Sequence, residues 1–385
     1  MEDLLLLSEE LTEEERLIQS TVRQFVDNEV IPAMPKAFEE AYFPEQLPRR
    51  LAELGLLGIT LPSKFGGAEA NYVTYGIICQ ELERGDSGLR SFASVQSSLC
   101  MYPIHRYGSE AQQQKYLPAM CRAELIGCFG LTEPDVGSDP SSMKTTAKKV
   151  DGGWVLNGAK MWITNAPIAD LAIVWAMTDE GVRGFIVEKD FDGFERPSIE
   201  QKLSLRASST GELVFSDCFV PDENYLPGSD KGIGAPLSCL SQARYGIAWG
   251  AIGAAIACFE IALDYTKERQ QFNKPVASFQ LVQNDLVNMF TEISKAQCLN
   301  LRLGRLKDAG KISPPMISLG KMNSCREALK IARMARNLLG ANGISLEYHV
   351  IRHMNNLESV FTYEGTDNIH HLILGKHLTG IDAFS

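Results

Sequence analysis

The stretch WVLNGAKMWIT, residues 154–164, decides the fold class, because it is the first clear β-strand signal in a chain whose earlier periodicity is helical. Its Asn157-Gly158 pair separates two apolar runs, and Asn-Gly favours the type I′ turn of a hairpin. We therefore predict a β-hairpin that turns at residues 157–158. Further strand-like runs, separated by Gly- and Asp-rich turns, continue to residues 219–221 and predict a small antiparallel barrel or sandwich.

Helical periodicity lies on both sides of this β region. Thr12 and Glu15 form a capping-box pattern at the start of the first helical segment. The later segments have apolar residues at helical spacing; they are residues 45–55, 73–84 and 110–122 before the strands, and 237–268, 278–309, 315–340 and 345–361 after them. The C-terminal lengths suit an up-down bundle. The predicted fold class is therefore α+β multidomain, with an N-terminal α-helical domain (1–126), a middle antiparallel β-barrel domain (127–235) and a C-terminal four-helix bundle (236–385).

The composition restricts the function class. The chain has 385 residues, a net charge of -11 and no basic stripe with interleaved aromatic residues, so nucleic-acid binding is not expected. The nine cysteines are scattered without a CxxC pair, which is typical of reduced thiols. No apolar run reaches the roughly 18 residues of a membrane span, and the acidic N-terminus lacks targeting features. We expect a cytoplasmic protein, or a mitochondrial-matrix protein if an organellar leader has been removed.

Several common motifs are incomplete in this sequence. The glycine-rich WGAIG at residues 249–253 follows no strand, so it is not a nicotinamide-binding fingerprint. His349 and His353 have the spacing of metal ligands on a helix, but Val350 stands where a zinc protease has glutamate, so no metal is predicted. No GxSxG elbow is present, and hydrolase chemistry has no support.

Glu364, in the TYEGT sequence of residues 362–366, lies on an interruption between two helical periods. By itself it is an exposed turn acid. Other stretches change this interpretation: CFGLTEPDVGSDPSSM (128–143), KMWITN (160–165), ARYGIAWG (243–250), ERQQFNKP (268–275) and LLGANGI (338–344). Together with TYEGT they resemble the flavin-dependent acyl-CoA dehydrogenases along the whole chain. LRSFASVQSSL (89–99) and HVIRHMNNLE (349–358) further resemble the glutaryl-CoA dehydrogenase branch.

The resemblance implies that Glu364 is the catalytic base, which removes the substrate α-hydrogen as a proton while a hydride leaves the β-carbon for flavin N5. A water-exposed glutamate, with a pKa of about 4.3, is too weak a base for this step, and burial raises that pKa. The isovaleryl and long-chain relatives place their base on another helix, directly before an arginine that matches Arg244. Ala243 occupies that position here and cannot accept a proton, which supports Glu364 as the base.

The resemblance also implies FAD as the cofactor, with residues on both flanks of its isoalloxazine ring. One flank matches Phe129, Gly130, Leu131, Thr132, Gly137 and Ser138, and the other matches Trp162, Ile163 and Thr164, with the Thr164 hydroxyl near N5 and Thr366 as a further contact. Trp162 as plain hairpin core is the alternative interpretation. Contacts to the flavin of a neighbouring subunit match Arg269, Phe272, Gln280, Gly340, Ala341, Asn342, Gly343 and Ile344, so a homotetramer is expected. A solvated helix end is the alternative for Arg269.

Arg90 determines the expected substrate class. In the glutaryl-specific branch the matching arginine binds the distal carboxylate of the substrate, a task that suits a planar guanidinium. The other residues that match substrate contacts are Ser91, Ser97, Ser138, Arg244, Tyr245 and Gly365. Glu83 and Tyr363 match residues that protonate the dienolate left by decarboxylation. The expected reaction is oxidative decarboxylation of glutaryl-CoA to crotonyl-CoA and CO2, with an electron-transferring flavoprotein as acceptor.

Other functions stay open at this point. One is a glutaryl-CoA dehydrogenase that does not decarboxylate, or a dehydrogenase for another short-chain acyl-CoA. A second is an acyl-CoA oxidase, in which reduced flavin reacts with oxygen. A third is a flavin-bearing binding module without turnover.

Overall fold

The N-terminal third of the chain is helical in the computed structural model, which describes residues 1–384. Its helices are α1 (Glu13–Phe25), a π-helical turn (Val26–Val30), α2 (Met34–Glu40), α3 (Leu47–Glu53), α4 (Tyr72–Gly85), α5 (Ser87–Ser94), a second π-helical segment (Val95–Met101), α6 (Tyr102–Tyr107) and α7 (Glu110–Cys121). The predicted capping box is confirmed, because Thr12 and Glu15 each accept a hydrogen bond from the other's backbone N–H.

The central part is a seven-stranded sheet with the order β1-β4-β2-β3-β7-β6, and β5 pairs with β4. The strands are β1 (Gly127–Gly130), β2 (Thr146–Val150), β3 (Gly153–Thr164), β4 (Leu171–Thr178), β5 (Gly181–Glu188), β6 (Phe194–Glu195) and β7 (Thr210–Pro221). Antiparallel pairing dominates, but β4 pairs in parallel with both β1 and β2. The sheet thus adds two parallel pairs to the antiparallel pattern that the sequence predicted.

The predicted hairpin at residues 157–158 is wrong. β3 continues through this pair and remains paired with β7, with only a shift of register there. Asn157 binds Asp217 of β7: its side-chain oxygen accepts from the Asp217 N–H at 2.9 Å, and its Nδ2 donates to Asp217 Oδ1 at 3.0 Å. The actual turn joins β2 to β3 at residues 151–152, where Gly152 has a φ of 72°. An Asp-Gly pair therefore makes the hairpin turn, and the Asn-Gly pair makes a bulge.

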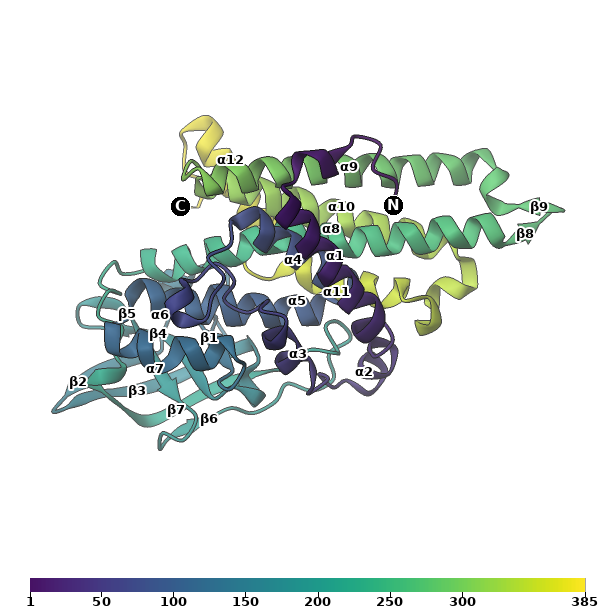
Figure 1. The fold of residues 1–385 in the computed structure, drawn as a ribbon. Coiled ribbons are helices and arrows are strands. Elements are labelled where there is room, and N and C mark those ends of the chain that lie inside the picture. Colours follow the sequence, from purple (N-terminus) through teal and green to yellow (C-terminus); the bar gives the residue numbers. More distant parts are fainter. Residues whose placement is uncertain (385) are drawn as a thin grey trace.

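The C-terminal part consists of α8 (Gly234–Glu268), the short strands β8 (Gln270–Gln271) and β9 (Lys274–Pro275), α9 (Gln280–Asp308), α10 (Pro314–Leu338), a 3-10 turn (Gly340–Ile344), α11 (Val350–Thr362) and α12 (Asp367–Thr379). In Figure 1 the strands β1–β7 gather at one end of the molecule and the β8–β9 hairpin lies at the other, with α8 running between them. This order of helices, sheet and helices matches the predicted architecture.

Glycines of α8 allow α4 to pack very closely against it. A Cβ atom at Gly253 would lie 1.9 Å from the Gln80 carbonyl oxygen, and one at Gly250 would lie 2.1 Å from Glu83 Oε2. The glycine-rich segment that is not a nucleotide fingerprint therefore serves helix packing, and it brings Glu83 against α8.

α8 is also the one helix among residues 1–384 that is long and apolar enough to cross a membrane, judged by length and composition alone. Of its most apolar window, 83% is buried inside the protein. The helix therefore packs as the core of the C-terminal bundle.

Candidate active site

A cavity of about 1070 Å³ lies where the sheet meets the helices. The loop after β1, the end of β3, the first turns of α8 and the turn between α11 and α12 all contribute to its walls. It brings together predicted residues from four separate parts of the sequence: Phe129, Leu131, Thr132, Gly137, Ser138, Trp162, Ile163, Thr164, Arg244, Tyr363, Glu364, Gly365 and Thr366. The cavity is therefore the candidate active site.

Glu364 lies in the turn between α11 and α12, and the local sequence explains why the helices break there. Thr366 caps α12, because its hydroxyl accepts a backbone N–H of the first helical turn at 3.4 Å. Glu364 and Gly365 have φ values of 52° and 104°. A side chain at position 365 would meet His370 Nε2 at 3.0 Å and Arg244 Nη2 at 3.1 Å, which favours glycine. Glu364 is a non-glycine residue with a positive φ, so its backbone is strained. Strained residues of this kind cluster at functional sites.

The Glu364 carboxyl group lines the cavity and has a raised pKa. Its Oε2 is buried and has no hydrogen-bond partner within residues 1–384. Burial raises the pKa of Glu364 from 4.5 to about 7, and the positive charges of Arg90, Arg244 and Lys321 oppose the rise. A carboxylate with this pKa and a free oxygen can accept a proton from a ligand in the cavity.

A second buried cluster contacts Tyr363, the residue before Glu364. Arg90 of α5 and Glu83 of α4 are 1% and 0% exposed, and Arg90 Nε donates to Glu83 Oε2 at 2.6 Å. Arg90 Nη2 donates to the Tyr363 hydroxyl, which also lies 3.3 Å from the Ser91 hydroxyl. Burial raises the pKa of Glu83, and the Arg90 charge opposes this. The structure thus places the three predicted catalytic residues and Arg90 in one connected group.

Some predicted contacts do not line the cavity. Ser97 accepts the Gly58 N–H at 3.0 Å, and the Tyr245 hydroxyl donates to the carbonyl oxygen of Tyr72 at 2.8 Å. Gly130, Arg90 and Ser91 are also absent from the cavity wall, although the last two reach it through Tyr363. The substrate contacts expected for Ser97 and Tyr245 stay predictions without support from the cavity geometry.

Glu133 and Lys160 form a buried ion pair that is not among the residues predicted from the sequence. Lys160 Nζ donates to Glu133 Oε1 at 2.8 Å, and Glu133 also accepts the backbone N–H groups of Lys144 and Thr145 at 2.6 and 2.9 Å. Burial lowers the pKa of Lys160 to about 8, and Glu133 opposes this. The pair joins the loop after β1 to β3, which are the two segments that form the predicted flavin flanks. Its signal in the sequence is a lysine within an otherwise apolar strand.

The walls and donors of the cavity fit a flavin. Hydroxyl groups that can donate hydrogen bonds to flavin ring atoms come from Thr132, Ser138, Thr164 and Thr366, beside the apolar side chains of Phe129, Leu131 and Ile163. Trp162 is 57% exposed and has a φ of 62°. Its indole ring is therefore available to a ligand and is not part of the sheet core.

The residues predicted to contact the flavin of a neighbouring subunit lie at the far end of α8. We call Arg269, Phe272, Gln280 and residues 340–344 the distal tip. Arg269 lies 25 residues beyond Arg244 along α8, which corresponds to about 37 Å at the rise of an α-helix. Phe272 and Ile344 are 86% and 64% exposed. The distal tip therefore does not reach the cavity of its own chain (Figure 1).

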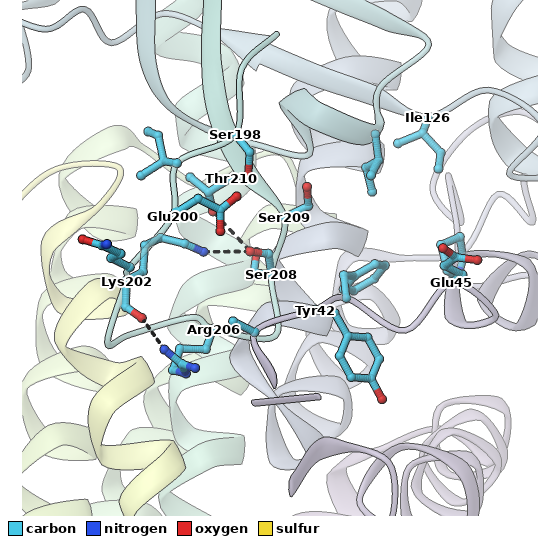
Figure 2. Close-up of a pocket in the computed structure, with 16 residues that line it drawn as sticks. Tyr42, Glu45, Ile126, Ser198, Glu200, Lys202, Arg206, Ser208, Ser209 and Thr210 are labelled. Carbon is cyan, nitrogen blue, oxygen red and sulfur yellow. Dashed lines mark hydrogen bonds between the residues drawn. The ribbon is translucent and has the colours of Figure 1, made fainter. Parts of the chain in front are cut away.

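A smaller cavity of about 370 Å³ lies between the N-terminal helices and the loop before β7. In Figure 2, Lys202 of this loop bonds to the Ser208 carbonyl oxygen at 2.8 Å, and Tyr42 and Glu45 come from the N-terminal helical part. None of its lining residues is predicted for catalysis or for cofactor binding. The larger cavity therefore remains the candidate active site.

Three domain families match the chain: "Acyl-CoA dehydrogenase, N-terminal domain" over residues 12–124, "Acyl-CoA dehydrogenase, middle domain" over 128–218, and "Acyl-CoA dehydrogenase, C-terminal domain" over 230–379. The chain belongs to the acyl-CoA dehydrogenase family. This membership confirms the predicted fold class, the flavoprotein oxidoreductase class and FAD as the cofactor.

Solved and curated relatives extend the similarity. The crystal structure of glutaryl-CoA dehydrogenase from Mycobacterium smegmatis, also solved in complex with FADH2, is 51% identical with a TM-score of 0.98, over 100% of this chain and 99% of that chain. A glutaryl-CoA dehydrogenase of Desulfococcus multivorans is 35% identical over 381 residues, 96% of this chain and 98% of the relative. A short-chain specific acyl-CoA dehydrogenase of Clostridium acetobutylicum is 36% identical over 371 residues, 94% and 97% of the two chains. The predicted resemblance to the glutaryl-CoA dehydrogenase branch is thus confirmed as a similarity.

Proposed function

We propose that this acyl-CoA dehydrogenase oxidises glutaryl-CoA and decarboxylates the product to crotonyl-CoA and CO2. The observation that carries the proposal is the Arg90 guanidinium, which is 1% exposed and bonds to Tyr363, the neighbour of the base. Its Nη1 has no hydrogen-bond acceptor within residues 1–384. A carboxylate at the end of a short acyl chain would pair with this cation through Nη1, whereas a plain alkyl chain would leave Nη1 without a partner. The other two nitrogens already bond to Glu83 and Tyr363.

Glu364 performs the first step as the base. Its unpartnered carboxylate takes the α-proton of the thioester, and a pKa of about 7 keeps a usable fraction ionised at neutral pH. FAD, when bound, supplies the acceptor for the hydride that leaves the β-carbon. Thr132, Thr164 and Trp162 are the residues on this chain that we expect to hold its ring.

The second step removes the distal carboxyl group. The bond between the γ-carbon and the carboxylate breaks, CO2 leaves, and the electron pair passes into a dienolate that ends on the thioester oxygen. A proton must then return to the γ-carbon to give crotonyl-CoA. We assign this donation to Tyr363, which lies beside Arg90, and the tyrosine recovers its proton from solvent after the product leaves. Glu83, whose Oε1 is buried without a partner, binds the guanidinium of Arg90 through Oε2.

The 51% identity to the glutaryl-CoA dehydrogenase of M. smegmatis supports glutaryl-CoA as the substrate. The glutaryl-CoA dehydrogenase of D. multivorans (35%) and the short-chain enzyme of C. acetobutylicum (36%) do not distinguish the two substrate classes, so the proposal rests mainly on Arg90. The exposed distal tip supports assembly, because it needs a second copy of the chain to meet a bound cofactor. We propose a homotetramer that passes its electrons to an electron-transferring flavoprotein.

Anaerobic reduction tests this proposal. The purified yellow protein is mixed with glutaryl-CoA, its absorbance near the flavin bands is followed, and CO2 and the acyl product are measured by mass spectrometry. We expect bleaching with one CO2 per crotonyl-CoA. If glutaconyl-CoA forms without CO2, the protein is a non-decarboxylating dehydrogenase. If peroxide forms in air without another electron acceptor, the protein is an oxidase.

A further inference from the structure

We propose that Lys321 of α10 is a positioning residue for the catalytic turn, because its ammonium group binds the backbone carbonyl oxygens on both sides of Glu364. The proposal rests on the proposed role of Glu364 as the base. It assigns a function to a buried cation that the reaction steps above do not use.

Lys321 is 1% exposed on the buried face of α10 that it shares with Ile317 and Ser324. Its Nζ donates to the carbonyl oxygen of Phe361 at 3.1 Å and to that of Gly365 at 2.9 Å. The first acceptor is in the last turn of α11 and the second directly follows Glu364. One ammonium group therefore connects the end of one helix to the start of the next across the base.

The cost of burying this charge argues against simple packing. Lys321 has no ion pair within residues 1–384, and burial lowers its pKa. A methionine would fill the same volume without a desolvation cost. The last carbonyl groups of a helix lack intrahelical partners and carry partial negative charge, so a cation there stabilises the end of α11. The position of the turn that follows α11 is thereby fixed.

Arg244 acts on the same turn from α8. Its Nε donates to the carbonyl oxygen of Glu364 at 2.6 Å. The carbonyl groups of Phe361, Glu364 and Gly365 are thus all bound by buried cations, whereas Oε2 of Glu364 has no partner. This division has a chemical reason. A cation bonded to the carboxylate would lower its pKa and weaken the base, but a cation bonded to the backbone orients the base and leaves it free.

The charge of Lys321 also acts on the base through space. The charged groups that face Glu364 are Arg90 of α5, Arg244 of α8 and Lys321 of α10, and all three lower its pKa against the effect of burial. Lys321 itself is faced by Cys325 on its own helix and by Asp367 and His370 of α12. Removing the Lys321 charge should therefore move the pKa of Glu364 above its present value of about 7.

Two substitutions separate orientation from charge. Lys321→Met removes both the donor and the charge, and Lys321→Gln keeps a donor for one carbonyl group without the charge. Lys330→Met is the matched control, because Lys330 is an exposed lysine of the same helix that pairs with Glu327. FAD content and the unfolding temperature of each variant establish that it is folded.

The assay is the exchange of the substrate α-hydrogens for deuterium in anaerobic D2O, read by mass spectrometry, together with the pH profile of kcat/KM. We expect exchange by Lys321→Met to fall about 10- to 100-fold, as for a base displaced by about an ångström. Lys321→Gln should recover part of that rate. In both variants the acid limb of the kcat/KM profile should move to higher pH, because the pKa of Glu364 rises. Lys330→Met should match the unmodified protein in every measurement.

The outcomes distinguish the two proposals. Unchanged exchange and an unchanged pH profile in Lys321→Met would overturn the role of Lys321. Loss of FAD from both variants would also overturn it, because Lys321 would then be a purely structural residue. If the unmodified protein neither exchanges α-hydrogens nor is reduced by any acyl-CoA, the proposed function itself fails.

Discussion

The two ends of α8 differ in how completely one chain builds them. At the Arg244 end, the three cations near Glu364 are Arg90 of α5, Arg244 of α8 and Lys321 of α10, and each donates hydrogen bonds within the same chain. At the distal tip, Phe272 is 86% exposed, and Leu281, the second residue of α9, is 82% exposed. Exposed apolar side chains at such a density are typical of a surface that another subunit covers. The comparison supports our proposal that one chain assembles the acid-base chemistry and that a second copy completes the cofactor site.

The strongest test of the first end is Glu364→Gln, which keeps the shape of the base and removes its ability to accept a proton. We expect turnover to fall about 10⁴-fold, at the upper end of the range for a general base. Bound FAD should be retained, and glutaryl-CoA should no longer bleach it. Full bleaching under anaerobic conditions would show that another group is the base.

Arg90→Ala tests whether the same end selects the substrate. Truncating one member of a buried, hydrogen-bonded charge pair costs several kcal/mol, so kcat/KM for glutaryl-CoA should fall about 100-fold or more. Turnover of butyryl-CoA, which has no distal carboxylate, should change much less. The variant is made in a Glu83→Gln background, because Glu83 would otherwise be left as an unpaired buried acid. It is compared with Glu83→Gln alone, so that the loss of Glu83 is not counted as an effect of Arg90. An equal loss of kcat/KM on both substrates would show that Arg90 does not bind the distal carboxylate of glutaryl-CoA.

Substitutions at the distal tip should weaken FAD binding and leave the base intact. For the double variant Arg269→Ala and Phe272→Ser we expect roughly tenfold weaker retention of FAD and dissociation of the oligomer on dilution, since each interface side chain contributes on the order of 1 kcal/mol. Light scattering gives the oligomeric state, and filtration gives the free FAD. Leu203→Ser, at a 77% exposed residue away from the tip, is the control. A double variant with unchanged mass and FAD content would contradict the shared-site interpretation.

The sequence predicted features that depend on near neighbours in the chain. The Thr12 capping box and the turn at Glu364 each have their whole signal within a few residues, and the apolar periodicity of α8 lies within one continuous segment. Asn157 misled the prediction because its partner, Asp217, is 60 residues away and converts a turn signal into a bulge. Lys321 was not identified for a similar reason.

The buried helices at residues 87–107 also could not be predicted from nearby residues in the chain. Their sequence is rich in serine, and no element was predicted there, yet the segment forms α5, a π-helix and α6. Ser94 and Ser98 are 1% and 6% exposed, and tertiary packing against α4 and α8 makes the helices stable. Arg90 lies within this segment, so its burial could be known only from the folded structure.

The smallest expected effect is the pH dependence of the unmodified protein. Burial raises the pKa of Glu364 to about 7, and only the ionised carboxylate can take the α-proton. kcat/KM should therefore rise with pH through this pKa, by about tenfold between pH 6 and pH 8, whereas a solvent-exposed glutamate with a pKa of about 4.3 would give a flat profile over that range. FAD retention, which depends on the distal tip, should not follow the same curve. A flat profile would mean that the pKa of the base is not raised in the free enzyme, and a parallel change in FAD content would mean that the two ends of α8 are not independent.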